Sequence, residues 1–140
     1  MTAVAAPTVR LRLAPGDTRG KLLDGAWWPR TNDLTTELPQ LVAELNGQRG
    51  TITHALARTE DWQAPHPKRL PGDRRAVRLA WFSSQPHGLV TLMTDFGRDR
   101  YDLVIVPAGA SGEQAETVMA AAADPDGERR APDLLTGLTA

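Results

Sequence analysis

The sequence contains no cysteine, and this absence excludes disulfide bonds, thiolate metal sites and a cysteine nucleophile together. Aromatic residues are also few: four tryptophans, two phenylalanines and a single tyrosine occur among 140 residues. Charge of one sign is not in excess either. The formal net charge is −1, so no global field attracts nucleic acid or an anionic membrane. Because a chain without cysteine suits a reducing compartment, we predict a cytoplasmic protein.

Long apolar runs are absent as well. No stretch approaches the roughly twenty apolar residues of a membrane span. The first seven residues carry neither the basic region nor the apolar stretch that directs export. A chain of 140 residues has the usual size of one domain, and we predict a single domain over residues 1–123. The remainder, residues 124–140, is rich in polar and small residues and is predicted to be disordered.

Apolar residues recur at spacings that predict six strands and two helices. The strands are expected near residues 8–13, 24–29, 51–58, 76–82, 89–94 and 101–107. One helix is expected after Asp33, with Pro39 either kinking it or delaying its start. The second helix begins with a capping box, Ser111 to Gln114.

These elements predict an α+β domain in the order β-β-α-β-β-β-β-α. We expect a twisted, mainly antiparallel sheet or half-barrel of five to six strands, with both helices on one side. The last three strands should form a meander. Residues 103–106 are apolar on both sides, so the last strand is expected to lie centrally under a helix.

The least ordinary stretch is residues 23–30, in which two tryptophans are adjacent in an extended segment. Neighbouring residues on a strand point to opposite faces, so one of Trp27 and Trp28 is expected in the core and the other near the surface. The exposed indole and Arg30 would then form a recognition edge, with Asp24 beside them. The alternative is that both indoles are packing residues and that Asp24 pairs with Arg30. The pattern leaves open which tryptophan is exposed.

The Leu-Asp-Gly-Ala-Trp-Trp-Pro-Arg sequence of residues 23–30 resembles a motif of a family of small uncharacterised actinobacterial proteins. Asp-Leu at 33–34, Glu-Leu-Pro at 37–39 and Leu-Val-Ile-Val-Pro at 103–107 extend the resemblance. It covers most of residues 9–123 and implies a shared fold and an actinobacterial origin. Because that family has no assigned activity, the resemblance implies no catalytic residue.

A basic segment, residues 68–78, carries five cations and one anion between Trp62 and Trp81. Cations such as Arg74 and Arg75 beside aromatic rings can contact a phosphate backbone while a ring stacks on a base. The alternative is that Trp81 belongs to the core and that the arginines are ordinary solvated residues. The segment therefore raises nucleic-acid binding as a second hypothesis.

The three histidines do not form a metal site by sequence spacing. His54 is in phase with Ile52 and Leu56 on the expected inner face of its strand. A buried histidine needs hydrogen-bond partners, and it is more often a structural residue than a base or a ligand. His66 and His87 are expected in loops. Without cysteine, a metal would need three separate segments to converge, so we predict no metal site.

No motif for nucleotide binding or nucleophilic catalysis occurs, since G-x-G-x-x-G, G-K-[ST] and a glycine-flanked serine elbow are all absent. We therefore predict a non-enzymatic binding or regulatory module for a protein or small ligand, with no cofactor and no catalytic residue. The expected contacts are the recognition edge and the long polar loop 59–75, which contains Trp62. The alternative is a nucleic-acid-binding protein that uses the arginine-rich 68–78 segment. A third hypothesis is an enzyme without a recognisable motif, which convergent histidine and carboxylate groups in a cleft would favour.

Overall fold

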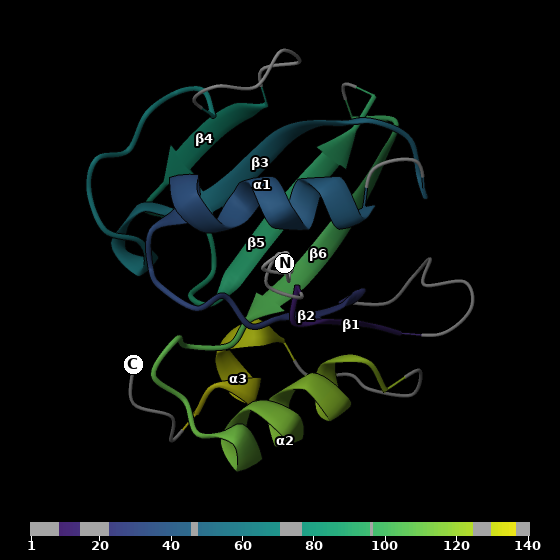
Figure 1. Ribbon diagram of the computed structural model, residues 1–140, viewed down its shortest axis with the longest axis vertical. Helices are drawn as coiled ribbons and strands as arrows, with labels where there is room; N and C mark the ends of the chain where they lie inside the picture. Colours follow the sequence, from purple (N-terminus) through teal and green to yellow (C-terminus); the bar gives the residue numbers. More distant parts are fainter. Residues whose placement is uncertain are drawn as a thin grey trace, which may run out of the picture.

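The computed structural model describes residues 9–14, 23–45, 48–70, 77–95, 97–124 and 130–136. The strands are β1 (Leu11–Leu13), β2 (Gly25–Trp27), β3 (Ile52–Arg58), β4 (Arg78–Phe82), β5 (Leu89–Thr94) and β6 (Asp99–Ile105). The helices are α1 (Leu34–Leu45), the single 3-10 turn η1 (Thr59–Asp61), α2 (Gly112–Ala122) and α3 (Ala131–Leu134) (Figure 1). The predicted order of the six strands and two main helices along the chain is confirmed.

The six strands form one mixed sheet in the order β1-β2-β6-β5-β3-β4. The pairs β1·β2, β3·β5 and β5·β6 are antiparallel, whereas β2·β6 and β3·β4 are parallel. The α+β class is confirmed, and β6 lies centrally as expected. The expected meander is wrong in one pairing, because β4 lies at the edge beside β3 and does not pair with β5. A parallel pair needs a long crossover, and the segment between β3 and β4 supplies it.

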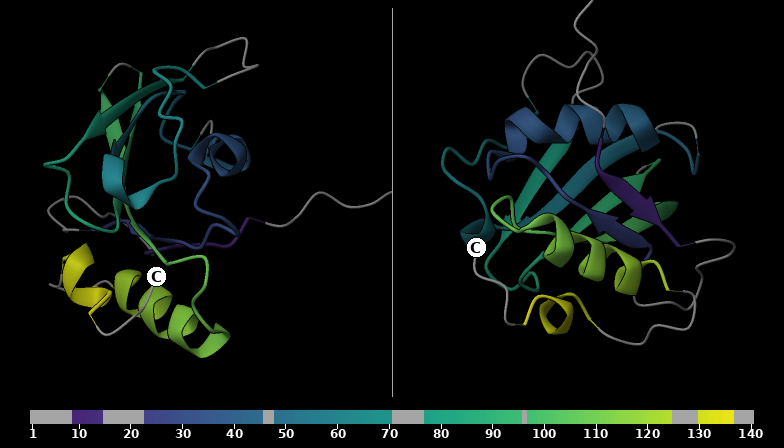
Figure 2. Two further views of the ribbon diagram at one scale, coloured as in Figure 1. Left: turned by 90° about the vertical axis from the view of Figure 1, so that its left-hand side faces the viewer. Right: turned by 60° about the horizontal axis from the view of Figure 1, so that its bottom comes forward.

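The helices cover opposite faces of the sheet, contrary to the expectation that both lie on one side (Figure 2). Helix α1 covers the front face, where its leucines pack against Trp27, Leu92 and Tyr101. Helices α2 and α3 cover the back face of β2 and β6, over Ala26 and Val104. Because both strands carry apolar side chains on both faces, each face of this part of the sheet needs a cover.

Helix α1 begins directly after Asp33, so the late start considered for Pro39 is not observed. The Asp33 carboxylate accepts hydrogen bonds of 2.8 Å from the hydroxyls of both Thr35 and Thr36. The backbone carbonyl of Asp33 also accepts from the N–H of Glu37, at 3.0 Å. Asp33 therefore anchors the first turn through both its side chain and its backbone.

The segment predicted as a disordered tail contains α3. Leu134 and Leu135 are buried and pack into the back-face cluster with α2. Gly88 has a φ of +74°, and a Cβ at this position would overlap the Leu135 side chain. The turn before β5 therefore needs a glycine for α3 to dock. None of the helices in the described ranges is long and apolar enough to cross a membrane.

Candidate functional site

A cavity of about 380 Å³ lies at one end of the sheet. Strands β2, β3 and β6 run in the same direction, so the segments that follow them meet at this end, together with the turn that precedes β5. Ligands of open sheets commonly bind beyond the carboxyl ends of parallel strands. The lining residues are Pro29, Thr31 and Asn32 after β2, Glu60, Asp61 and Trp62 after β3, His87 and Gly88 before β5, Ile105, Pro107, Ala108 and Gly109 at the end of β6, and Leu135.

The most constrained polar group in the cavity wall is the Asp61 carboxylate. Its Oδ1 lies 2.7 Å from Nδ1 of His87, and its Oδ2 accepts the backbone N–H of Gly88 at 2.8 Å. The Asp61 side chain is 10% exposed, whereas that of His87 is 58% exposed. Since Asp61 engages Nδ1, the imidazole is oriented with Nε2 on the far side of the ring. This nitrogen can accept a hydrogen bond from a ligand, or donate one when the ring is doubly protonated.

The remaining wall is mainly apolar. Trp62 is buried and packs against Trp27, with ring centroids 5.9 Å apart. The N–H of Gln63 donates to the carbonyl of Asn32 at 2.9 Å, which ties the loop after β3 to the loop after β2. The structure thus brings the tryptophan motif and the beginning of the long polar loop together at one cavity. No group of three or more metal-ligating side chains occurs in the ranges that the structure describes.

The two adjacent tryptophans point to opposite faces, as predicted. Trp27 is the buried one, in the front cluster, while Trp28 is half-buried and packs against the back cluster. Trp28 is not an open platform, because the Arg10 guanidinium carbon lies 3.8 Å from its ring centroid. Arg10 also donates to the carbonyls of Trp28 and Pro29, at 3.0 and 3.1 Å. Burial, followed by the positive charge of Arg30, lowers the pKa of Arg10.

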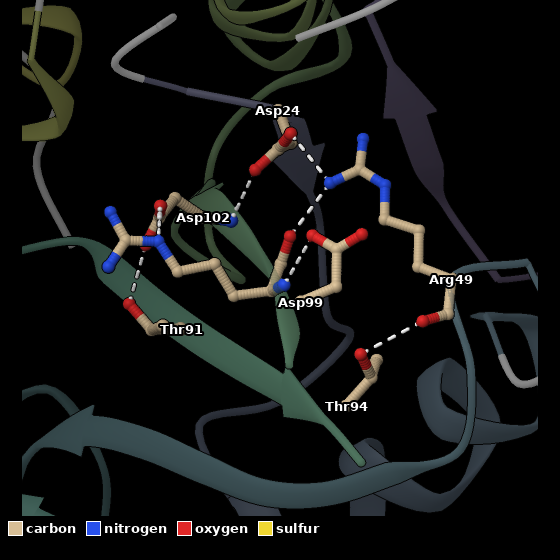
Figure 3. Close-up of polar contacts among 7 residues, drawn as sticks. Asp24, Arg49, Thr91, Thr94, Asp99 and Asp102 are labelled. Atoms are coloured by element: carbon tan, nitrogen blue, oxygen red, sulfur yellow. Dashed lines mark hydrogen bonds and ion pairs between the residues drawn. The ribbon is translucent and has the colours of Figure 1, made fainter. Parts of the chain in front are cut away.

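Asp24 belongs to a buried polar network near the amino-terminal ends of β2 and β6, away from the cavity (Figure 3). Its Oδ1 accepts from Arg49 at 2.9 Å, and its Oδ2 accepts the backbone N–H of Asp102 at 2.7 Å. The Asp102 carboxylate in turn accepts from Thr91 at 2.8 Å and pairs with Nε of Arg100 at 3.0 Å. Both carboxylate oxygens of Asp24 and both of Asp102 have a donor, so Asp24 acts as a structural tie between β2 and β6.

The placement predicted for His54 is wrong. A register irregularity between Ile52 and His54 changes the alternation along β3, so Ile52 and Ala55 face the front cluster while His54 faces the back. His54 is half-buried there, and its Nδ1 lies 2.9 Å from the Thr53 hydroxyl. An extra residue in one strand reverses the phase of all those that follow.

Of the three arginines predicted as contacts, the structure describes Arg30. Arg30 is exposed beside the cavity wall, since the next residue, Thr31, belongs to the lining. The backbone N–H of Arg30 donates to Glu37 at 2.9 Å, which holds this loop against α1. Arg74 and Arg75 lie outside the residues that the structure describes.

Residues 10–122 match a family model described as a family of unknown function, DUF5994. This match spans well over half of the chain. The chain belongs to DUF5994. No curated protein and no solved structure matches it. The predicted resemblance to an uncharacterised family is therefore confirmed at the level of the family. All lining residues of the cavity except Leu135 fall within the DUF5994 segment.

Sequence reasoning missed the Asp61–His87 pair of this DUF5994 chain, because the two residues are 26 positions apart in different loops. They meet because β3 and β5 are antiparallel neighbours, so the residue just after β3 lies beside the turn just before β5. The signal was present in part: a carboxylate follows one predicted strand closely, and His-Gly directly precedes another. Only the strand order turns that signal into a contact.

Proposed function

We propose that this protein binds a small amphipathic organic molecule in the cavity beyond the carboxyl-terminal ends of β2, β3 and β6. The observation that carries the proposal is the meeting of a mainly apolar wall with one oriented polar pair, Asp61 and His87. A few placed polar groups in an otherwise apolar cavity of roughly 300–1,000 Å³ are typical of small-ligand sites.

The polar end of the cavity favours a ligand with a single hydrogen-bonding head. Both Asp61 oxygens are already engaged, so this carboxylate orients His87 instead of binding the ligand itself. Glu60, the other acidic lining residue, is paired with Arg58 at 3.3 Å. We therefore assign recognition of the head group to Nε2 of His87 and contact with the apolar body to Trp62 and its neighbours in the wall. The proposal concerns binding and includes no catalytic step.

A cavity-filling substitution tests this site with a fluorescent probe, 1-anilinonaphthalene-8-sulfonate. For a probe of this size, we expect a Kd of about 10–100 µM in a cavity of this kind. A Cβ added at Gly109, in the lining, meets no atom within 4 Å, so Gly109→Leu should fold and weaken probe binding at least about tenfold by occupying the space. Gly112→Leu, which also adds its Cβ in open space but lies outside the lining, is the matched control. Equal binding by both variants in a fluorescence titration would overturn the proposal.

Three statements about this chain stay predictions from its sequence: its actinobacterial origin, its cytoplasmic location and its role as a non-enzymatic binding or regulatory module. The cavity supports the last of these, because it offers a site of ligand size to a domain whose family has no assigned activity.

A further inference from the structure

A second surface is independent of the cavity. The back face of β4, β3 and β5 is left open by the described helices, because α1 lies on the front and α2 and α3 pack against β1, β2 and β6 (Figure 2). This face lies on the side of the sheet away from α1, whereas the cavity lies beyond the carboxyl-terminal ends of β2, β3 and β6.

Five residues lie side by side across this open face. Arg69 is opposite Arg78, Arg78 is opposite His54, His54 is opposite Met93, and Met93 is opposite Arg100. Directly opposed residues on neighbouring strands share a face of the sheet. With strands about 4.8 Å apart, this arginine row spans about 19 Å. Three of its five members carry a permanent positive charge.

Among the residues that the structure describes, few carboxylates compensate the positive charges of the arginine row. Arg69 and Arg78 are both exposed and directly opposed, and like charges in this arrangement repel. Neither forms an ion pair with any carboxylate in the described ranges. Arg100 pairs with Asp102 through Nε, but its side chain is 64% exposed, which leaves the end of the guanidinium to solvent. An anion bound along the row would relieve this repulsion.

The same face carries an exposed aromatic ring. Phe82 follows Arg78 by four residues on β4, so its side chain points to the same face about 13 Å away. It is 45% exposed and is the one exposed large hydrophobic residue among those described. The half-buried side chains of Leu56 and Ala80 lie between Phe82 and the arginine row. Cations beside a flat apolar surface with an aromatic ring are the combination that binds single strands.

We infer that the open face binds single-stranded nucleic acid, with the arginines of the row contacting phosphates along the strand and Phe82 stacking on a base. An acidic protein segment would satisfy the arginines but would leave the aromatic ring without a planar partner. The net charge of −1 adds no long-range attraction for nucleic acid. The affinity therefore depends on charge interactions over distances shorter than the Debye length, about 10 Å. Binding at physiological salt should therefore be no tighter than tens of micromolar.

Fluorescence anisotropy with a labelled oligothymidine of about twelve nucleotides tests this inference. Three phosphate contacts predict a slope of log K against log salt of about −2 between about 50 and 200 mM, because each contact contributes about −0.7. Arg78→Ala should reduce the slope by about 0.7, whereas Arg78→Lys should keep it. Arg130→Ala, an exposed arginine at the start of α3, is the matched control and should leave binding unchanged.

Phe82→Ala separates nucleic acid from other polyanions. Loss of one stacked base should weaken oligothymidine binding at least about fivefold, while binding of heparin, which has no bases, should not change. Circular dichroism and thermal melts establish that each variant is folded. The inference is overturned if oligothymidine does not bind at low salt, if Arg78→Ala binds as the unmodified protein does, or if Phe82→Ala has no effect. Gly109→Leu, which fills the cavity, should leave oligothymidine binding intact, so the two sites are tested separately.

Discussion

Trp27 and Trp28 show how neighbouring residues of the same type take different roles. Trp27 is 2% exposed and joins the cluster under α1, where Trp62 packs against it. Trp28 lies on the other face, half-buried, with the Arg10 guanidinium stacked on its ring. An indole covered by a cation gains stability from that contact and is not open to a partner.

The two tryptophans should therefore differ in their contribution to stability. Trp27→Ala should cost about 3–5 kcal/mol, from lost burial and the cavity left behind. Trp28→Ala should cost less, about 1–3 kcal/mol, because its ring is only partly removed from solvent. Urea denaturation of the two variants measures both values. Equal losses would place both indoles in the core, and a negligible loss at Trp28 would mean that the Arg10 contact contributes nothing.

Among the elements, α1 depends on its first turn. Asp33 precedes the helix and accepts hydrogen bonds from two threonine hydroxyls, and the helix then continues through Pro39. The hydroxyl of Thr36, followed by that of Thr35, lowers the pKa of the Asp33 carboxyl group.

This pKa shift predicts a pH-dependent contribution to stability. The folded-state pKa of Asp33 lies below the unfolded value of about 3.9, so the stabilisation is present above that pH and is lost as the pH falls through the folded pKa. Asp33→Ala should therefore lower Tm at pH 6, and the difference from the unmodified protein should shrink toward pH 3. Thr36→Val, which removes one donor, should show a smaller effect of the same sign. A Tm difference that does not depend on pH would contradict this account.

Periodicity was enough to predict the elements but not their neighbours. The apolar spacing placed β3, β5 and α2 within a residue or two, because burial on one face imposes a period on the sequence. It could not show that β4 pairs with β3, since strand order depends on packing between segments far apart in the chain. It also failed at His54, where one irregular residue reversed the alternation without any mark in the sequence.

The candidate site was predictable only in part, for the same reason. The loop 59–75 and the tryptophan motif were both expected to contact a ligand, but the packing of Trp62 against Trp27 was not predicted. Asp61 follows one predicted strand and His87 precedes another, but nothing in either segment indicates that these two strands are neighbours. Their contact follows from the antiparallel pairing of β3 and β5, which belongs to the whole fold.

At the scale of the whole molecule, α3 has a structural role because it covers part of the back face of the sheet together with α2. Leu134 and Leu135 bury themselves against α2 and the turn at Gly88, and Leu135 also lines the cavity. The last described segment of the chain thus belongs to the core and to the candidate site together.

Loss of this contact should destabilise the protein. Leu135→Ala should cost about 2–4 kcal/mol, since a buried leucine is replaced by a cavity, and should lower Tm by about 5–15 °C. Asp133→Ala, an exposed neighbour on the same helix, should change stability by less than about 0.5 kcal/mol. Thermal melts of both variants test the docking of α3. An unchanged Tm for Leu135→Ala would mean that this segment does not contribute to the folded core.

The parallel pairing of β2 with β6 has a consequence for how the chain folds. The hydrogen bond between Asp102 and Asp24 joins residues 78 positions apart, and β6 is the neighbour of both β2 and β5. Closing so long a loop costs more entropy than forming a hairpin, and contacts between distant residues slow folding. During synthesis, the β1–β2 hairpin and the β3–β4–β5 unit can form early, but they have no strand to join them until β6 leaves the ribosome. The core around Trp27 therefore lacks the β6 side chains Tyr101, Leu103 and Ile105 until late in synthesis, and we expect these long-range contacts to form last.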